Sequence, residues 1–234
     1  MINDYKIIDF HSHILPCADH GSDGIKTSKN QVALMNNAGV DTAVLTPHFH
    51  PDRHRVEDLL AIVSSSADEL IRACDERPHF CIGAEVLYCD GIENMEGLDS
   101  LCIRGTNALL LELPMRLKWE KAILYEVKRI AARHTVILAH IDRYMPFHQA
   151  DFIALLSSDN IYAQINASSL FNEGDRSAIM QFIDADCVCG IGSDLHDASK
   201  KQYRFFEKAE KKLGESYGRI MKNSEKILKD AILF

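Results

Sequence analysis

The sequence predicts an α/β fold with a parallel sheet, built as one domain over residues 1–234. Apolar runs rich in β-branched residues recur seven times. Their starts lie 25 to 39 residues apart, which leaves room for a crossover helix each time. No linker, low-complexity tract or charge block divides the chain. The even spacing and the seven units favour a seven-stranded βα barrel over a doubly wound sheet.

The expected strands are these seven runs. They are apolar throughout rather than alternating, which is typical of strands that are covered on both faces. In chain order the runs are residues 6–10, 41–46, 80–84, 107–111, 135–139, 160–165 and 187–192.

Helical signals fill the segments between the runs. Ser28 and Gln31 form a capping box that predicts the start of a helix, and Gly39 stands where a C-terminal capping glycine belongs. Residues 56–76 place apolar side chains at helical spacing until Pro78 ends the pattern. The other expected helices cover residues 118–133, 199–213 and 217–232.

The composition excludes several classes of protein. The chain carries 34 acidic and 26 basic residues, and no Lys/Arg-dense stretch indicates a nucleic-acid partner. No run of 18 apolar residues and no secretory signal are visible, so we expect a cytoplasmic protein without membrane insertion. No cysteine is followed six positions later by arginine, which disfavours cysteine-based phosphate chemistry. Eleven histidines against one tryptophan indicate metal or proton chemistry instead.

A polar residue follows each apolar run, where the strand is expected to end. In βα barrels the chemistry is built on these carboxyl ends. In chain order the residues are His11 and His13, His48, Glu85, Glu112, His140, Asn166, and Asp194 with His196.

This donor set predicts a metal centre. His11 and His13 are two apart on extended backbone, so both imidazoles leave the same face and can reach one ion. Asp194 and His196 repeat that spacing. The set exceeds the needs of one metal and suits a multinuclear site in which carboxylates bridge the ions. Mn, Fe or Zn would be the preferred ions.

The same residues carry a resemblance to a known family. The segments that carry it are residues 9–16, 19–21, 46–48, 83–85, 112–114, 139–144, 164–168 and 193–196. In this order they resemble the PHP (polymerase and histidinol phosphatase) superfamily. More narrowly, they are similar to its bacterial capsule and exopolysaccharide branch, the metal-dependent protein-tyrosine phosphatases. The match spans nearly the whole chain.

The resemblance implies a distorted seven-stranded βα barrel with three divalent ions, usually Mn or Fe, at its C-terminal mouth. The implied ligands are His11, His13, Glu85 and Asp194 for the first ion; Glu85, Glu112 and His140 for the second; His48 and His196 for the third. Arg143 matches the family's phosphate-gripping arginine and is therefore expected to bind the substrate and to act in catalysis. Its planar fork suits phosphate oxygens.

Two positions depart from the tyrosine-phosphatase branch. That branch has two consecutive aspartates before a glycine, where this chain has Asp19 and His20. The resemblance to other branches implies that His20 is a ligand of the third ion at a catalytic position, with Asp19 as a further catalytic candidate. Beyond His196 the branch often carries an arginine, and Lys201 or Lys200 is expected to replace it as a point charge at the phosphate.

The predicted activity is phosphomonoester hydrolysis. By resemblance, the substrate is a phosphotyrosine protein, namely a tyrosine autokinase of capsule or exopolysaccharide synthesis. The departures at His20 and Lys201 motivate an alternative, a phosphoesterase for a small molecule such as histidinol phosphate or a sugar phosphate. A third hypothesis is a non-catalytic metal-binding regulatory module. That hypothesis predicts a broken ligand set, whereas the set here is complete.

Overall fold

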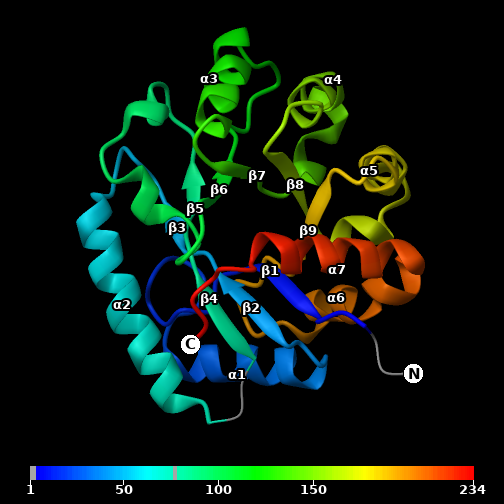
Figure 1. The fold of residues 1–234 in the computed structure, drawn as a ribbon. Coiled ribbons are helices and arrows are strands. Elements are labelled where there is room, and N and C mark those ends of the chain that lie inside the picture. The colour runs from blue at the N-terminus through cyan, green and yellow to red at the C-terminus, as the bar shows by residue number, and fades with distance from the viewer. Residues whose placement is uncertain (1–3, 76–77) are drawn as a thin grey trace.

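The computed structural model describes residues 4–75 and 78–234, and it has an α/β architecture in which helices surround the strands (Figure 1). All strand pairings are parallel. The strands are β1 (Ile8–Ser12), β2 (Thr42–Leu45), β3 (His48–Phe49), β4 (His79–Ile82), β5 (Glu85–Leu87), β6 (Ala108–Glu112), β7 (Thr135–Leu138), β8 (Ile161–Asn166) and β9 (Val188–Gly192).

The strands form two sheets, with the orders β1-β2-β4 and β3-β5-β6-β7-β8-β9. Each of the seven predicted runs overlaps a strand, and β3 and β5 are additional. Both begin directly after a short break, since β3 follows β2 across Pro47 and β5 follows β4 across Gly83. Proline has no backbone N–H to donate to a ladder, which accounts for the first break. Backbone hydrogen bonds nevertheless cross it, from Gly83 to Leu45 O and from Glu85 to Pro47 O, both at 3.0 Å.

The two sheets also approach each other at the other end of the strand order. Ser12 at the end of β1 forms an isolated parallel bridge with Leu195 beyond β9. His13 N donates to Leu195 O at 3.1 Å, and Asp194 N donates to His11 O at 2.9 Å. The α/β class and the parallel pairing are therefore confirmed. The closed seven-stranded barrel stays a prediction.

Seven α-helices are present among the described residues: α1 (Ile25–Asn37), α2 (Val56–Ala73), α3 (Lys121–Ala131), α4 (Met145–Leu156), α5 (Glu173–Asp184), α6 (Lys200–Leu213) and α7 (Glu215–Ile227). Short 3₁₀ turns follow several strands, namely η1 (Ile92–Asn94), η2 (Leu98–Leu101), η3 (Ile141–Tyr144) and η4 (Ala167–Phe171). No helix in the described ranges is long and apolar enough to cross a membrane.

The predicted capping box is wrong. Helix α1 begins at Ile25, with Gly24 at the N-cap, so Ser28 lies inside the helix. Its hydroxyl forms hydrogen bonds with Ser22 Oγ at 2.7 Å and with Gly24 O at 3.3 Å. The buried Gln31 side chain donates to Leu195 O at 3.4 Å instead of bonding the helix start. Ser28 thus bonds the turn before the helix and Gln31 bonds a distant segment, so neither makes the cap that the spacing indicated.

Two helices, α4 and α5, were not predicted by periodicity. Helix α4 contains Pro146 in its first turn and a non-helical residue, His148, so its apolar residues do not follow one continuous stripe. Helix α5 opens with a glycine and charged residues, and the Asn172 side chain caps it by accepting from Gly174 N at 3.2 Å. The last helix ends at Ile227, earlier than expected.

Candidate metal centre

Donor atoms from several strand ends lie together at one end of the sheets. Among the described residues, three groups have donor atoms within 4.8 Å of one another. The groups are His11, His13 and Glu85; His48, Glu85 and Glu112; and His13, His48 and His196. Six of the nine predicted ligands thus belong to these groups, which confirms that the fold brings them together.

The carboxylate of Glu85, the first residue of β5, lies at the middle of the cluster. Its Oε2 is 3.0 Å from His48 Nδ1, 3.2 Å from His11 Nε2 and 3.4 Å from His13 Nε2. Yet buried Glu85 Oε2 and His48 Nδ1 form no hydrogen bond with the described residues. A buried oxygen facing three imidazole nitrogens without a hydrogen bond fits a shared cation, because imidazole and carboxylate are ligands of Mn, Fe and Zn.

The protonation of His11 and His13 supports the same conclusion. Gln164 Oε1 accepts from the backbone N–H of His140 at 2.7 Å, so His11 Nδ1, 3.1 Å from that oxygen, is a donor. His13 Nδ1 donates to the Asp19 carboxylate at 2.7 Å. In the neutral rings both Nε2 atoms therefore carry lone pairs, and they lie 3.0 Å apart. Lone pairs at this distance repel unless a proton or a cation lies between them.

The charges around these histidines favour a cation. Burial acts to lower the pKa values of His11 and His13, but Glu85 and Asp194, joined at His13 by Asp19, outweigh burial and raise both pKa values. Burial acts to raise the pKa values of Glu85 and Asp194, yet the histidines hold both below their usual range. Metal binding would release the protons that the histidines hold.

Glu112 and His140 form the second side of the cluster. His140 Nε2 lies 2.6 Å from Glu85 Oε1 and 3.7 Å from Glu112 Oε1, while its buried Nδ1 has no hydrogen bond with the described residues. Burial and the Glu85 charge raise the pKa of Glu112 to about 7. His140 and Asp194 both have positive φ, at 30° and 52°, a conformation that is uncommon for residues other than glycine.

The third group surrounds His196. Its Nδ1 donates to Asp194 O at 3.0 Å, so the lone pair is on Nε2, which faces His48 Nε2 at 3.4 Å. Burial and the neighbouring His13 lower the pKa of His196 to about 4. The exposed ring of His20 stacks on His48, with 4.5 Å between centroids, but no nitrogen of His20 belongs to the three donor groups. His20 therefore lies at the centre without joining these groups.

The other predicted site residues differ in their placement. The Asp19 carboxylate accepts hydrogen bonds from His13 and from the backbone N–H groups of Gly21 and His48, the last two at 2.8 and 3.0 Å. It therefore holds His13 and the backbone at His48 in place. The half-exposed guanidinium of Arg143 forms an ion pair with Asp194 Oδ2 at the edge of the cluster. The Lys201 side chain lies outside the described part of the structure.

Two residues of β8 contact the ligands: Asn166, which stands in the predicted series of strand-end residues, and Gln164, which does not. The single oxygen of Gln164 bonds both His11 and His140, as described above. Asn166 Nδ2 donates to Asp194 Oδ2 at 2.9 Å. The available signal was a glutamine inside an otherwise apolar strand, two positions before Asn166 and hence on the same face. Because Gln164 determines which nitrogen of His11 is free, it is a candidate positioning residue.

We expect Gln164→Met to weaken metal binding by roughly 10- to 100-fold, the usual cost of losing a hydrogen bond to a ligand. Methionine keeps the length of the side chain but cannot accept the two hydrogen bonds. The measurement is Mn²⁺ affinity by competition with a chelator, with circular dichroism to check folding. Gln181→Met, at an exposed position of α5, is the matched control. Unchanged affinity in a folded Gln164→Met variant would contradict a positioning role.

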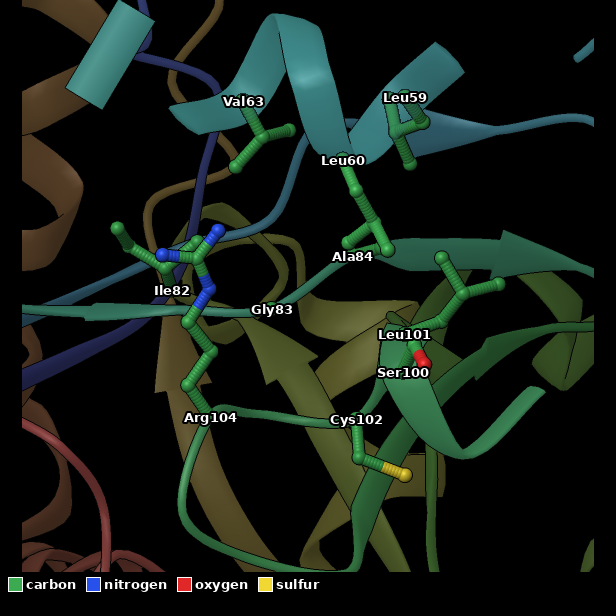
Figure 2. Close-up of a pocket in the computed structure, with 10 residues that line it drawn as sticks. All are labelled: Leu59, Leu60, Val63, Ile82, Gly83, Ala84, Ser100, Leu101, Cys102 and Arg104. Atoms are coloured by element: carbon green, nitrogen blue, oxygen red, sulfur yellow. The ribbon is translucent and has the colours of Figure 1, made fainter. Parts of the chain in front are cut away.

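A small cavity of about 10 Å³ lies apart from the donor cluster, between α2, β4 and η2. Figure 2 shows Leu60 and Val63 of α2 facing Ile82 and Ala84 across it. This volume is about that of one water-sized probe, and most of the lining is apolar. The cavity is therefore a packing gap below the site, and the donor cluster remains the candidate functional centre.

Comparisons with known proteins identify the family of this chain. The family model for capsular polysaccharide synthesis, CpsB/CapC, matches residues 7–229. The tyrosine-protein phosphatase CpsB of Streptococcus pneumoniae is 24% identical over 252 residues, covering 97% of this chain and 100% of that protein. The protein of the same name from Streptococcus agalactiae serotype V is 24% identical over 245 residues, covering 96% and 99%.

Solved structures have the same fold. One belongs to a study of YwqE from Bacillus subtilis and CpsB from S. pneumoniae, described as unique metal-dependent tyrosine phosphatases. It matches with a TM-score of 0.76 and 19% identity, covering 97% of this chain and 96% of that one. The putative histidinol phosphatase HisK from Listeria monocytogenes matches with a TM-score of 0.56 and 13% identity, covering 90% and 98%. Because the family model spans nearly the whole sequence, this chain belongs to the CpsB/CapC family of capsular polysaccharide synthesis.

Proposed function

We propose that the protein is a metal-dependent protein-tyrosine phosphatase, a phosphoric monoester hydrolase. The convergence of three imidazoles on Glu85 Oε2, an oxygen without a hydrogen bond to the described residues, carries this proposal, because it fits a multinuclear metal site. The names of the relatives support the substrate class. We further propose that the phosphotyrosine protein is a tyrosine autokinase of capsule or exopolysaccharide synthesis, reached in the cytoplasm.

The proposed cofactors are three divalent ions, with Mn²⁺ preferred over Fe or Zn. The residues that would hold them are His11, His13, Glu85 and Asp194 for the first; Glu85, Glu112 and His140 for the second; His48, His196 and His20 for the third. When bound, the ions would lower the pKa of a water and neutralise phosphoryl oxygens. The three donor groups and the stacking of His20 on His48 support this assignment.

The chain's own residues would bind and orient the substrate. Arg143 would turn its guanidinium from Asp194 toward the phosphoryl oxygens, which it can contact in a bidentate manner. Burial and His48 lower the pKa of His20, so its imidazole is neutral at pH 7 and suits a ligand better than an acid. A phenolate leaving group has a pKa of about 10 and therefore needs little proton donation from a protein acid. Lys201 is proposed as a further phosphate contact.

The proposal includes one domain over residues 1–234 that forms a distorted seven-stranded βα barrel. Counting β2 with β3 and β4 with β5 gives seven strand units, which supports this count. The bridge between Ser12 and Leu195 supports closure between β1 and β9.

The test is hydrolysis of para-nitrophenyl phosphate and of a phosphotyrosyl peptide by the purified chain, with metal analysis on the same preparation. We expect activity with Mn²⁺, loss of at least about 99% after exhaustive chelation, and recovery when Mn²⁺ is restored, because the bound ions would lower the pKa of the attacking water. A protein treated with chelator and then dialysed into the starting Mn²⁺ buffer controls for unfolding. Full activity in metal-free protein would contradict the proposal.

A small-molecule phosphoesterase is the second candidate. The exposed His20 ring lies at the centre, at a position where the tyrosine-phosphatase branch has an aspartate. This departure from the branch favours the small-molecule phosphoesterase. Comparison of kcat/KM on histidinol phosphate, a sugar phosphate and a phosphotyrosyl peptide distinguishes the two. A strong preference for the alkyl phosphates would replace the first proposal. A non-catalytic metal-binding module would instead bind metal without hydrolysing any of these esters.

A further inference from the structure

Three large apolar side chains are exposed beside the metal centre. Met115, Leu117 and Phe147 have exposed fractions of 64%, 75% and 62%. Met115 lies three residues beyond Glu112, a span of at most about 11 Å. Phe147 lies four residues beyond Arg143, in the first turn of α4. Such residues gathered beside a site indicate a surface that a ligand covers.

The segment that carries Met115 and Leu117 is held in place by buried contacts. Trp119 Nε1 donates to Pro114 O at 2.8 Å, which closes the segment on itself. The Trp119 ring stacks on His148 of α4, with 3.7 Å between centroids. His148 Nε2 in turn donates to Arg116 O at 2.6 Å. The contacts to α4 join the segment to the helix that carries Phe147. Because its backbone is already ordered, a ligand would lose little conformational entropy on binding it.

The same surface is basic. Arg116 and Lys118 alternate with the two apolar residues of the segment and are exposed. The half-exposed Arg143 precedes Tyr144, whose hydroxyl donates to Leu113 O at 2.7 Å, two residues before Met115. The acidic residues nearby are Glu120, which follows the segment, and Asp151 of α4, whose carboxylate is paired with His148 at 2.9 Å. The chain as a whole carries a net charge of −8, so this local excess of positive charge runs against the composition. An anionic partner with apolar groups is complementary to it.

We propose that Met115, Arg116, Leu117, Lys118 and Phe147, here called the substrate rim, bind the peptide that flanks a phosphotyrosine. This inference rests on the proposed phosphatase activity and specifies the substrate. The rim fits a phosphotyrosyl segment with acidic and apolar neighbours. A sugar phosphate or histidinol phosphate offers too little apolar surface to cover all three exposed side chains.

The experiment compares two substrates on the same Mn²⁺-loaded enzyme. The triple variant Met115→Ser, Leu117→Ser and Phe147→Ser should raise KM for an acidic and apolar phosphotyrosyl peptide about 10-fold or more, because three interface side chains are lost. Its kcat/KM on para-nitrophenyl phosphate should stay within about 2-fold of wild type, since that small substrate does not reach the whole rim. All three positions are exposed, so folding should be preserved. Ile62→Ser, at an exposed position of α2, is the matched control.

A charge variant tests the second half of the inference. The double variant Arg116→Gln and Lys118→Gln should raise KM for the acidic peptide. KM for a peptide in which glutamines replace the acidic residues should stay nearly unchanged. Lys211→Gln, exposed on α6, is its control.

Equal losses of kcat/KM on the peptide and on para-nitrophenyl phosphate, or no loss on either, would contradict the role of the substrate rim while leaving the phosphatase proposal intact. A wild type that hydrolyses neither substrate would overturn both proposals. A dimer that the triple variant converts to monomer without a change in KM would assign the rim to contact between copies.

Discussion

Glu85→Ala is expected to lower kcat on para-nitrophenyl phosphate by about 10³-fold or more and to reduce the bound metal below the wild-type content. The carboxylate faces His11, His13 and His48 with one oxygen and His140 with the other. Its removal therefore takes a shared negative charge from two donor groups at once. A metal ion contributes several kcal/mol to stabilising the transition state, and about 4 kcal/mol corresponds to about 10³ in rate.

Metal content and activity must be measured on the same preparations. Glu96→Ala, at an exposed position after η1, is the matched control and should retain both. His13→Ala should behave like Glu85→Ala, because His13 belongs to two of the three donor groups. Circular dichroism separates loss of metal from loss of fold. A folded Glu85→Ala protein with normal metal content and normal kcat would contradict the proposed metal centre.

Arg143→Ala is expected to lower kcat/KM by about 10²- to 10³-fold, the range for removing one preorganised donor from a developing charge. Metal content should remain unchanged, because Arg143 is not a proposed ligand. Arg143→Lys should recover only part of the activity, since an ammonium supplies the charge without the planar pair of donors. Steady-state kinetics with para-nitrophenyl phosphate, alongside inhibition by inorganic phosphate, provides the measurement.

The control for this variant is Arg129→Ala. Arg129 is also a partly exposed arginine paired with a carboxylate, that of Glu93, but it lies on α3. Its loss should leave kcat/KM within about 2-fold, as expected for an exposed ion pair. Undiminished kcat/KM in Arg143→Ala would show that Arg143 serves only to hold Asp194. A parallel loss of metal would assign the effect to the ligand Asp194 instead.

Much of the fold could be predicted because the relevant signals are local. The seven apolar runs each overlap a strand, and α2 begins at the predicted residue. The failures came where contacts that residue spacing does not encode decided the outcome. Ser28 joins a buried network with Ser22 rather than capping α1, and Pro47 breaks a strand whose ladder continues beyond it. Helix α4 was not predicted because its buried residues do not recur at a regular helical spacing.

By itself, the sequence determined which residue types stand at the strand ends, because side-chain alternation and apolar runs are properties of neighbouring residues. That was enough to predict His11, His13 and Glu85 as partners in one centre. Only the tertiary structure decided how these groups are oriented. The oxygen of Gln164 determines which ring nitrogen of His11 is free to bind a metal, and the Asp19 carboxylate does the same for His13. His148 donates a hydrogen bond that holds the segment of the substrate rim in place. Each of these hydrogen bonds depends on atoms that meet only after folding, so spacing along the chain could not reveal them.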